Sequence, residues 1–372
     1  MKVLLVITHG NIGGATNIVV DLAKGLKSRG IDVTVGYSEG EYLRKKLSDN
    51  AIPEIILKNI KRSHNPFAAL FFVFEMKKLA KKAGFDVVQF NSSNALPGCL
   101  GVKLANRKIK TAFTVHGLSV LDKNCKTFFL LKFAYYLAFK FFFLFTDSVI
   151  FESKNNLEYA QSIKLVKDGP VIYNGLSASD LVFLSKDDAK SALEKKITAN
   201  LGGKFLIGSI GRLSYQKNYE FLIKMFPEIL KMKNDAACVV LGDGPDRSMY
   251  ERLVGGSHLK NDFFLAGEVS DASQYLKAFD LFILPSRYEG VPVTLEECLF
   301  ADVPVLASNV GGNNEILAAT NLYRLNDEED FMEKFSALLK NGIGVAGDTD
   351  LKQKFTADNM CQGYFDLFHR LS

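Results

Sequence analysis

The feature that most restricts the fold is a repeated alternation of short β-branched or aromatic runs with longer amphipathic stretches. This alternation is typical of βαβ units, in which helices connect parallel strands and cover the sheet. We therefore predict the α/β class. The predicted strands are Val3–Thr8, Asp32–Tyr37, Val87–Phe90, Thr111–Val115, Val149–Phe151 and Val171–Tyr173 in the first half, then Phe205–Ile210, Ala237–Leu241, Phe263–Ala266, Leu281–Leu284 and Val303–Ala307.

These two series of strands predict two domains. The chain has 372 residues, and at about 150 residues per domain this is enough for two separate cores. A polar stretch without motifs, Leu176–Gly203, separates the series. We expect a Rossmann-like domain over residues 1–175, a linker over 176–203 and a second Rossmann-like domain over 204–350. Ligands gather at the carboxyl-end loops of such sheets, and two domains would enclose a cleft.

The composition narrows the class of protein further. Hydrophobic residues at 48% and charged residues at 23% exclude a disordered tail, a collagen-like repeat and a conventional coiled coil. The five cysteines are far apart and never form a CxxC pair, so they suggest neither a disulfide framework nor a zinc site. The first apolar run ends before His9, too early for a signal peptide. We expect a reducing, cytoplasmic location.

Charge is distributed unevenly along the chain. Residues 1–180 hold 25 Lys and Arg against 14 Asp and Glu, whereas the remainder holds 21 against 27. The basic half suggests an anionic partner, either nucleic acid or a lipid surface, and ordinary solvated lysines would give the same count.

One stretch of the basic half, Thr127–Phe145, has 16 apolar residues in 19. Against a membrane span, Lys132 and Lys140 would each cost about 2.5–3.5 kcal/mol near the bilayer centre. On a helix the two lysines fall within about 80° of each other, which favours an interfacial helix. A core helix with an unusually apolar face is the alternative. Phe67–Lys82 also sets an apolar block beside lysines. We therefore expect peripheral membrane contact through both segments.

The segment from Leu281 to Glu315 carries the clearest chemistry. A predicted strand is followed by a loop with Glu289 and Gly290, then by a helix that contains Glu297. The free amides at the start of a helix suit a phosphate, whereas carboxylates accept hydrogen bonds from neutral hydroxyls. The arrangement predicts a site for a glycosyl diphosphate. Two surface glutamates around an ordinary helix start are the simpler alternative.

A second loop supplies cations for the same chemistry. Arg212 and Lys217 follow the strand Phe205–Ile210, and two fixed cations can neutralise a diphosphate without a metal. The histidines lack the spacing of metal ligands. We expect no metal and no cofactor.

Together these motifs resemble the family 4 glycosyltransferases of the GT-B fold, retaining enzymes that use nucleotide sugars in bacterial polysaccharide assembly. The strongest match is E-x7-E, which Glu289 and Glu297 satisfy, together with the family's Arg and Lys pair at Arg212 and Lys217. The match spans nearly the whole chain. Weaker matches, in the family's order, are Gly13-Gly14-Ala15, His116-Gly117, Asn174-Gly175 and Gly242-Asp243-Gly244-Pro245.

The resemblance implies a role for each matching residue. Glu289 would contact the hydroxyls of the donor sugar, Glu297 the ribose, and Arg212 with Lys217 the diphosphate. His116 would lie near the C6 hydroxyl or the acceptor. Looser assignments place the base near Gly267 and Val269, phosphate contacts at Gly14, Gly290, Val293 and Thr294, and the acceptor side at Gly13 and Thr16. Many relatives have an acidic residue where this chain has Thr16 and Asn17.

The implied reaction transfers a sugar, from UDP by our interpretation, to a saccharide or polyprenyl-linked saccharide in capsule or O-antigen synthesis. The resemblance implies retention of the anomeric configuration, for which we favour same-face attack. It also implies a last helix, 351–372, that crosses back to the first domain, and we expect the domains to close. The enzyme would lie on the cytoplasmic face of the inner membrane.

Other functions remain open. A GT-B relative acting as a sugar-nucleotide epimerase, a hydrolase or a non-catalytic donor-binding protein would share the fold. A dinucleotide-dependent oxidoreductase is disfavoured because Gly10, Gly13 and Gly14 lack the GxGxxG spacing. Nucleic-acid binding is disfavoured because no reader motif is recognisable.

Overall fold

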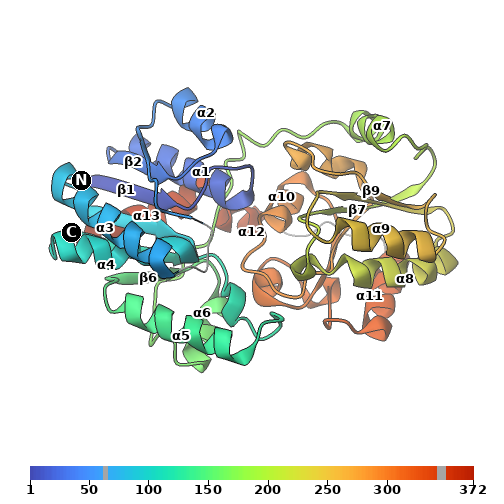
Figure 1. Ribbon diagram of the computed structural model, residues 1–372. Coiled ribbons are helices and arrows are strands. Elements are labelled where there is room, and N and C mark those ends of the chain that lie inside the picture. The colour runs from blue at the N-terminus through green and yellow to red at the C-terminus, as the bar shows by residue number, and fades with distance from the viewer. Residues whose placement is uncertain (62–65, 342–348) are drawn as a thin grey trace. The chain divides into compact units, whose positions relative to one another are not determined.

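The computed structural model describes residues 1–61, 66–341 and 349–372 (Figure 1). The chain divides into two compact units. Unit 1 comprises Met1–Ser177 and Lys354–Ser372, and unit 2 comprises Ala178–Gln353. Residues 342–348, which we assigned to the second domain, lie outside the described residues, as does His64.

Unit 1 is built on a six-stranded parallel sheet with the order β3-β2-β1-β4-β5-β6. Val3 to Val6 of the central strand β1 are fully buried. Such continuous burial is characteristic of a parallel strand covered by helices on both faces. The strands are β1 (Lys2–Ile7), β2 (Asp32–Tyr37), β3 (Glu54–Ile56), β4 (Val87–Asn91), β5 (Lys110–Val115) and β6 (Ser148–Phe151).

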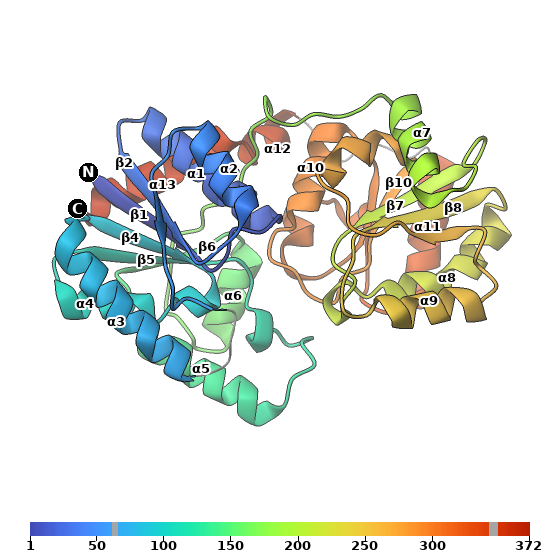
Figure 2. The same cartoon turned by 45° about the horizontal axis from the view of Figure 1, so that its top comes forward.

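Helices α1 and α13 pack together on one face of this sheet, and α3 and α4 pack on the other (Figure 2). The core of the second face includes Phe72, Met76, Phe90, Phe113 and Phe139. The helices are α1 (Gly14–Ser28), α2 (Glu41–Asp49), α3 (Pro66–Ala83), α4 (Gly98–Ala105), α5 (Phe129–Phe143), α6 (Lys154–Ser162) and α13 (Ala357–Leu371), with short 3₁₀ helices η1 (Ser93–Ala95) and η2 (Ser119–Leu121).

Unit 2 repeats this architecture with the parallel order β12-β11-β10-β7-β8-β9. Its strands are β7 (Phe205–Ile210), β8 (Ala236–Leu241), β9 (Phe263–Leu265), β10 (Leu281–Leu284), β11 (Val305–Ser308) and β12 (Leu322–Tyr323). Side chains of α8, α9 and α11 form one core against the sheet, in which Phe226, Tyr250 and Phe331 are fully buried. Segments α7, α10 and η4 pack together elsewhere in the unit.

The remaining elements of the chain belong to unit 2. They are α7 (Lys186–Ile197), α8 (Tyr219–Met232), α9 (Arg247–Gly256), α10 (Val293–Ala301), α11 (Glu328–Asn341), α12 (Thr349–Lys354, which ends at the boundary) and the 3₁₀ helices η3 (Tyr215–Lys217), η4 (Ala272–Ala278), η5 (Gly311–Glu315) and η6 (Ala319–Asn321).

The two parallel sheets confirm the predicted α/β class and the pair of Rossmann-like folds. The predicted strand Val171–Tyr173 is wrong, because only an isolated bridge joins Val171 to Phe151. The expected linker 176–203 contains α7, whose Ala189 and Leu193 are fully buried within unit 2.

Candidate functional site

The loops after β7, β8, β10 and β11 meet at the carboxyl edge of the sheet in unit 2. They approach so closely that two positions require glycine. A Cβ on Gly242 would lie 2.1 Å from the carbonyl oxygen of Gly211, and a Cβ on Gly311 would lie 2.1 Å from that of Glu289. Both glycines also have positive φ, of +147° and +51°. The edge is therefore a packed set of backbone turns that fixes the side chains it carries.

Lys217 and Glu289 form an ion pair at this edge. Nζ of Lys217 lies 2.6 Å from Oε1 of Glu289, and the side chains are only 16% and 8% exposed. Gln216 donates to the other carboxylate oxygen of Glu289 over 3.3 Å. The ammonium of Lys217 has three N–H donors, so it can hold Glu289 and still donate to a phosphate oxygen. The structure thus brings together two residues that are 72 positions apart in the chain.

Three residues that the sequence analysis missed hold these loops in place. Asn218, buried and left-handed at φ 57°, donates to the Pro285 carbonyl over 2.9 Å. The guanidinium of Arg287 stacks 4.1 Å above the Tyr215 ring and donates to the Tyr215 carbonyl over 2.6 Å. Gln216 accepts from the Arg287 amide through its carbonyl. An asparagine directly before a helix was the only sequence signal, because asparagine tolerates left-handed backbone.

Helix α10 begins at Val293, directly after Pro292. The amides of Leu295 and Glu296 donate to the Pro292 carbonyl. Within the described ranges, the amides of Val293 and Thr294 have no acceptor, as expected for the first residues of a helix. These donors and the helix dipole can bind an anion. Gly290, between Glu289 and the helix, accepts from the Gly312 amide over 2.8 Å, which fixes the loop that leads into α10.

Glu297 lies in the interior of α10, and its surroundings differ from those of Glu289. Its pKa is raised to about 7, chiefly by burial and to a smaller extent by the charge of Asp271, although a hydrogen bond from Ser273 opposes the shift. The carboxyl group is therefore partly protonated near neutral pH. The two glutamates of the E-x7-E pattern accordingly have different electrostatic environments.

The remaining predicted donor residues are Arg212 and two residues that follow β9, Gly267 and Val269. Arg212 is exposed, and among the described side chains none pairs with its guanidinium. Gly267, with φ +79°, accepts from the Gly242 amide over 2.8 Å through its carbonyl, and Val269 is half-buried. The structure places these residues within unit 2 but gives them no contact with Lys217 or Glu289.

In unit 1 the glycine turn after β1 leads into α1. Gly13 precedes the helix and its carbonyl accepts from the amides of Thr16 and Asn17. Gly14 is the first helical residue. The hydroxyl of Thr16 donates to the Asn11 carbonyl over 2.8 Å and the side chain is buried, so Thr16 stabilises the turn itself.

His116 follows β5 and belongs to a buried polar network at the carboxyl edge of the sheet in unit 1. Its Nδ1 lies 2.9 Å from Oε2 of Glu152, and its Nε2 lies 3.2 Å from Oδ1 of Asn91. Glu152 follows β6 and also accepts from Asn174 over 2.6 Å. The imidazole is 19% exposed. No sequence motif indicated this pairing with Glu152.

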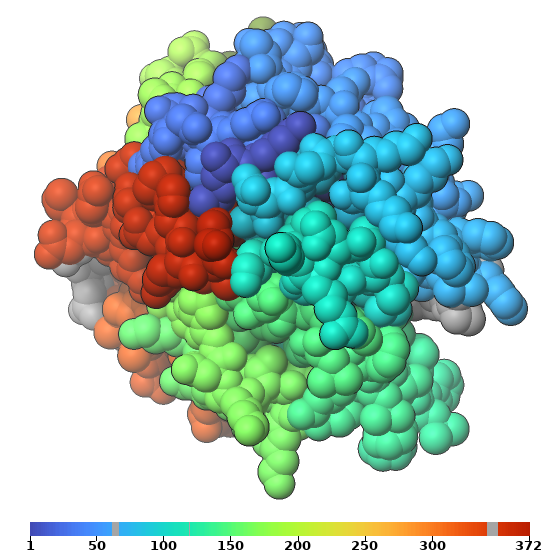
Figure 3. Space-filling view, turned by 90° about the vertical axis from the view of Figure 1, so that its left-hand side faces the viewer, coloured from blue at the N-terminus to red at the C-terminus, as the bar shows by residue number. Residues whose placement is uncertain are grey.

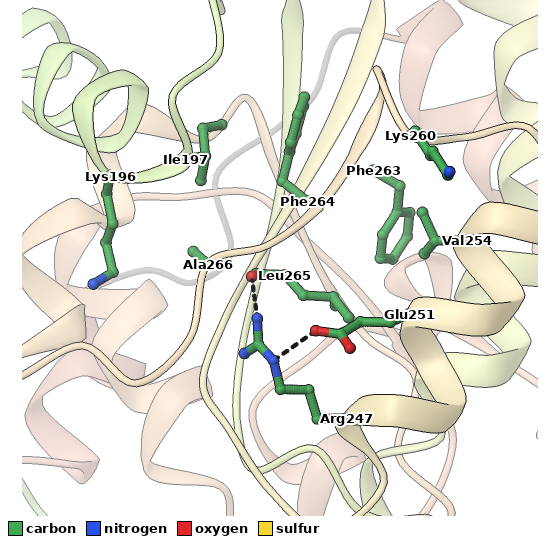
Figure 4. Close-up of a pocket in the computed structure, with 10 residues that line it drawn as sticks. All are labelled: Lys196, Ile197, Arg247, Glu251, Val254, Lys260, Phe263, Phe264, Leu265 and Ala266. Atoms are coloured by element: carbon green, nitrogen blue, oxygen red, sulfur yellow. Dashed lines mark hydrogen bonds and ion pairs between the residues drawn. The ribbon is translucent and has the colours of Figure 1, made fainter.

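One pocket of unit 2 lies away from these side chains. It has a volume of about 410 Å³ and lies beside β9 and α9. Its lining, which Figure 4 shows, includes Lys196, Arg247 and Lys260. Arg247 is held there by Glu251 and by the Leu265 carbonyl, over 2.8 and 3.1 Å. None of Arg212, Lys217, Glu289 and Glu297 lines it. The pocket and the Lys217–Glu289 ion pair therefore lie at different places in unit 2.

The described residues contain neither a group of metal ligands nor a helix that could span a membrane. No three His, Cys, Asp or Glu side chains in residues 1–61, 66–341 and 349–372 are grouped so that they could bind a metal. Over the same ranges, no helix combines the length and the apolar character needed to cross a bilayer.

Known proteins resemble the chain over most of its length. The family model "Glycosyltransferase Family 4" matches residues 12–180, and "Glycosyl transferases group 1" matches residues 191–356. An N,N'-diacetylbacillosaminyl-diphospho-undecaprenol alpha-1,3-N-acetylgalactosaminyltransferase of Campylobacter jejuni is 28% identical, covering 86% of this chain and 85% of that protein. A UDP-Gal:alpha-D-GlcNAc-diphosphoundecaprenol alpha-1,3-galactosyltransferase of Escherichia coli is 26% identical, with coverages of 76% and 74%.

A solved structure also shares the fold. HepE from Anabaena, crystallised with UDP-glucose, superposes with a TM-score of 0.80 at 20% identity, and the match covers 100% of both chains. The two parallel sheets with their flanking helices thus have the fold of GT-B proteins.

Proposed function

The chain belongs to the family 4 glycosyltransferases, and from this membership we propose that it transfers a sugar from a UDP-sugar to a lipid-linked saccharide. The product would extend a surface polysaccharide such as a capsule or O-antigen. The Lys217–Glu289 ion pair carries the proposal, because it sets a cation for phosphate beside a carboxylate for sugar hydroxyls.

The proposed chemistry follows from charge development. Breaking the bond between the anomeric carbon and phosphate leaves negative charge on UDP. Lys217, Arg212 and the α10 amides would stabilise that charge, so the step needs no metal ion. Same-face attack by the acceptor hydroxyl would retain the anomeric configuration, with a leaving phosphate oxygen taking the acceptor proton.

The choice of donor and acceptor is supported by the relatives. The Campylobacter jejuni and Escherichia coli proteins are named for acceptors on diphospho-undecaprenol, and the latter for UDP-galactose. A polyprenyl acceptor would reside in a membrane, so the enzyme must reach a lipid surface from the cytoplasmic side.

Helices α5 and α3 of unit 1 offer such a surface. Phe139 is the one buried residue of α5, whereas Phe128, Phe129 and Leu130 at its start are 87%, 78% and 78% exposed. On α3, Phe67 is 66% exposed, and other apolar side chains of both helices are also exposed. Both helices pack on the same core of the sheet. We propose that these side chains enter an anionic lipid surface, with the α3 lysines beside the headgroups.

The two lysines of α5 have different surroundings. Lys132 donates to the Asp122 carbonyl over 2.8 Å, and Lys140 lies over the Tyr136 ring at 5.9 Å while remaining exposed. Lys140 is therefore the more accessible of the two to headgroups, and Lys132 would reach them through its remaining N–H donors.

Product analysis tests the proposed function. The protein is incubated with labelled UDP-sugars and a polyprenyl-diphosphate-linked saccharide, with and without a chelator. We expect a glycosylated lipid that keeps the donor's anomeric configuration, at the same rate in chelator. Free sugar alone would favour the alternative, a hydrolase, and a modified nucleotide sugar would favour an epimerase. Binding without turnover of any donor in the panel would favour a non-catalytic donor-binding protein.

A further inference from the structure

The carboxylate of Glu152 is the feature of unit 1 that the proposed function does not explain. Its side chain is 3% exposed at the carboxyl end of β6. One oxygen, Oε2, accepts from His116 over 2.9 Å and from Asn174 over 2.6 Å. A buried carboxylate is costly unless it is paired. This pairing requires a hydrogen on Nδ1 of His116, because a carboxylate only accepts.

The other ring nitrogen of His116 also faces an acceptor. Asn91 donates through Nδ2 to Gln89 Oε1 over 2.8 Å and accepts at Oδ1 from Gln89 Nε2 over 2.8 Å. Its Nδ2 lies 3.4 Å from the Val6 carbonyl as well. A joint flip of both amides would preserve the reciprocal pairing, whereas the Val6 carbonyl can only accept, so the Val6 contact orients the Asn91 amide. The Asn91 oxygen is then the atom 3.2 Å from His116 Nε2. That contact needs a hydrogen on Nε2.

An imidazole ring satisfies two acceptors only when both nitrogens are protonated. We propose that Glu152 is a positioning residue that holds His116 as an imidazolium, whose Nε2–H donates to an oxygen of the bound sugar or acceptor. The inference rests on the proposed glycosyl transfer for its role in catalysis. The contact with Asn91 is the longer of the two, and it is the one that a substrate oxygen would replace.

The groups around this pair are consistent with a positive charge on His116 and a negative charge on Glu152. Through Gln89, the network continues to Thr114, and Thr114 is hydrogen-bonded over 2.9 Å to Tyr364 of α13. Burial raises the pKa of Tyr364, so its phenol stays neutral. The titratable side chains that these hydrogen bonds connect are His116, Glu152 and Tyr364.

An imidazolium cannot act as a general base, so His116 does not take the proton of the acceptor hydroxyl. In transfer, the acceptor O–H bond and the bond from the anomeric carbon to the phosphate oxygen break. The bond from the anomeric carbon to the acceptor oxygen forms. The electron pair of the broken glycosyl bond stays on phosphate, and a phosphate oxygen takes the acceptor proton. His116 therefore contributes charge and a hydrogen bond while the proton bypasses it.

The test uses ¹⁵N-labelled histidine in the full chain at about pH 7.5, where an unperturbed histidine is mostly neutral. His116 is assigned with His116→Gln. We expect both of its ring nitrogens at shifts of protonated nitrogen in the wild type. In Glu152→Gln, whose amide keeps an acceptor oxygen but loses the charge, one nitrogen should move to the unprotonated position. One unprotonated nitrogen in the wild type, or no change in the variant, would overturn the proposal.

Asp147→Asn is the matched control. Asp147 lies at the opposite end of β6 and accepts from Lys103 over 2.5 Å and from the Thr111 amide over 2.7 Å. The Asp147→Asn substitution should lower the stability of the protein and leave the His116 signals unchanged. In transfer assays, Glu152→Gln should lower kcat by about 10- to 100-fold with little change in donor KM. The spectra need no substrate, so a chain without transferase activity would refute the proposed function but still leave the charge assignment tested.

Discussion

Arg212 and Lys217 lie five positions apart in one loop, yet their surroundings differ. Lys217 is mostly buried and paired with Glu289, whereas Arg212 is exposed and has no side-chain partner among the described residues. An exposed, unpaired cation contributes little to folding. Its value lies in the charge that it can offer to a ligand.

We predict that Arg212→Ala lowers kcat by about 10²- to 10³-fold, by analogy with the loss of one oxyanion donor. The melting temperature should stay the same, because the side chain is exposed and forms no ion pair with another described side chain. Steady-state transfer assays and thermal melting measure both effects. Arg252→Ala, an exposed arginine of α9 in the same unit, should alter neither. A variant that melts early but transfers sugar normally would refute this role.

Glu297 permits a prediction about pH. Its folded pKa of about 7 lies above the usual glutamate value of 4.5, chiefly through burial. As pH rises from 4.5 to 7, the unfolded chain has released this proton and the folded chain still holds it, so stability falls through that window.

Glu297→Gln removes the titration, and its melting temperature should therefore rise relative to the wild type across this window and level off above it. The gain should reach several degrees, since about 1 kcal/mol corresponds to about 2–4 °C in a domain of this size. Thermal melting in the absence of ligand, at a series of pH values, checks the effect. A constant difference between the two proteins at every pH would contradict it.

Residue-level prediction from the sequence brought together residues whose proximity follows from strand order, and it missed contacts that depend on the directions of loop side chains. The proximity of Glu289 to a cation loop follows from strand order, because the carboxyl ends of parallel strands meet at one edge. The pairing of His116 with Glu152, 36 positions away, depends on the side-chain directions of two loops. No local pattern encodes those directions.

At the scale of elements, hydrophobic runs located the strands, including the three-residue edge strand β9, except for β3 and β12. β12 has two residues, too few for a recognisable alternation, and none of the three residues of β3 is buried. Val171–Tyr173 has strand composition, yet only Val171 pairs, through an isolated bridge to Phe151 of the edge strand β6. Strand propensity was therefore not sufficient to extend the sheet by another strand. For α5, composition could not separate a core helix from an interfacial one, because both are rich in Phe and Leu.

The exposed start of α5 gives the element-scale prediction. Replacing Phe128, Phe129 and Leu130 together with Ser should abolish co-flotation with anionic liposomes at low salt, because each buried apolar side chain contributes about 1.5–3 kcal/mol. Folding should be unaffected, since these side chains are mostly outside the core. Val182→Ser, exposed at 60% in unit 2, is the control. If the wild type remains at the bottom of the gradient, the proposed membrane surface is wrong.

At the scale of the whole molecule, the chain leaves unit 1 at Ser177 and re-enters it at Lys354. Helix α13 then packs on α1, and Figure 3 shows this last segment in red against the blue first segment of unit 1. Phe368 is fully buried there beside Tyr364. Helix α13 is therefore part of the core of unit 1.

We predict that Phe368→Ala destabilises unit 1 by about 3–5 kcal/mol and leaves unit 2 intact. Phe335→Ala, a fully buried residue of α11, should do the reverse. Calorimetry resolves the two transitions, because UDP should raise the unit 2 transition alone. A joint shift of both transitions in each variant would show that the units do not unfold separately.

Calorimetric titration of UDP tests the central claim, which is that the Lys217–Glu289 edge binds the nucleoside diphosphate. Loss of a hydrogen bond to a charged group costs about 1.5–3 kcal/mol, so Lys217→Ala should weaken binding about 10- to 100-fold. Lys260→Ala, in the cavity beside β9, should bind like the wild type. If Lys260→Ala loses UDP while Lys217→Ala retains it, the donor site has been assigned to the wrong residues.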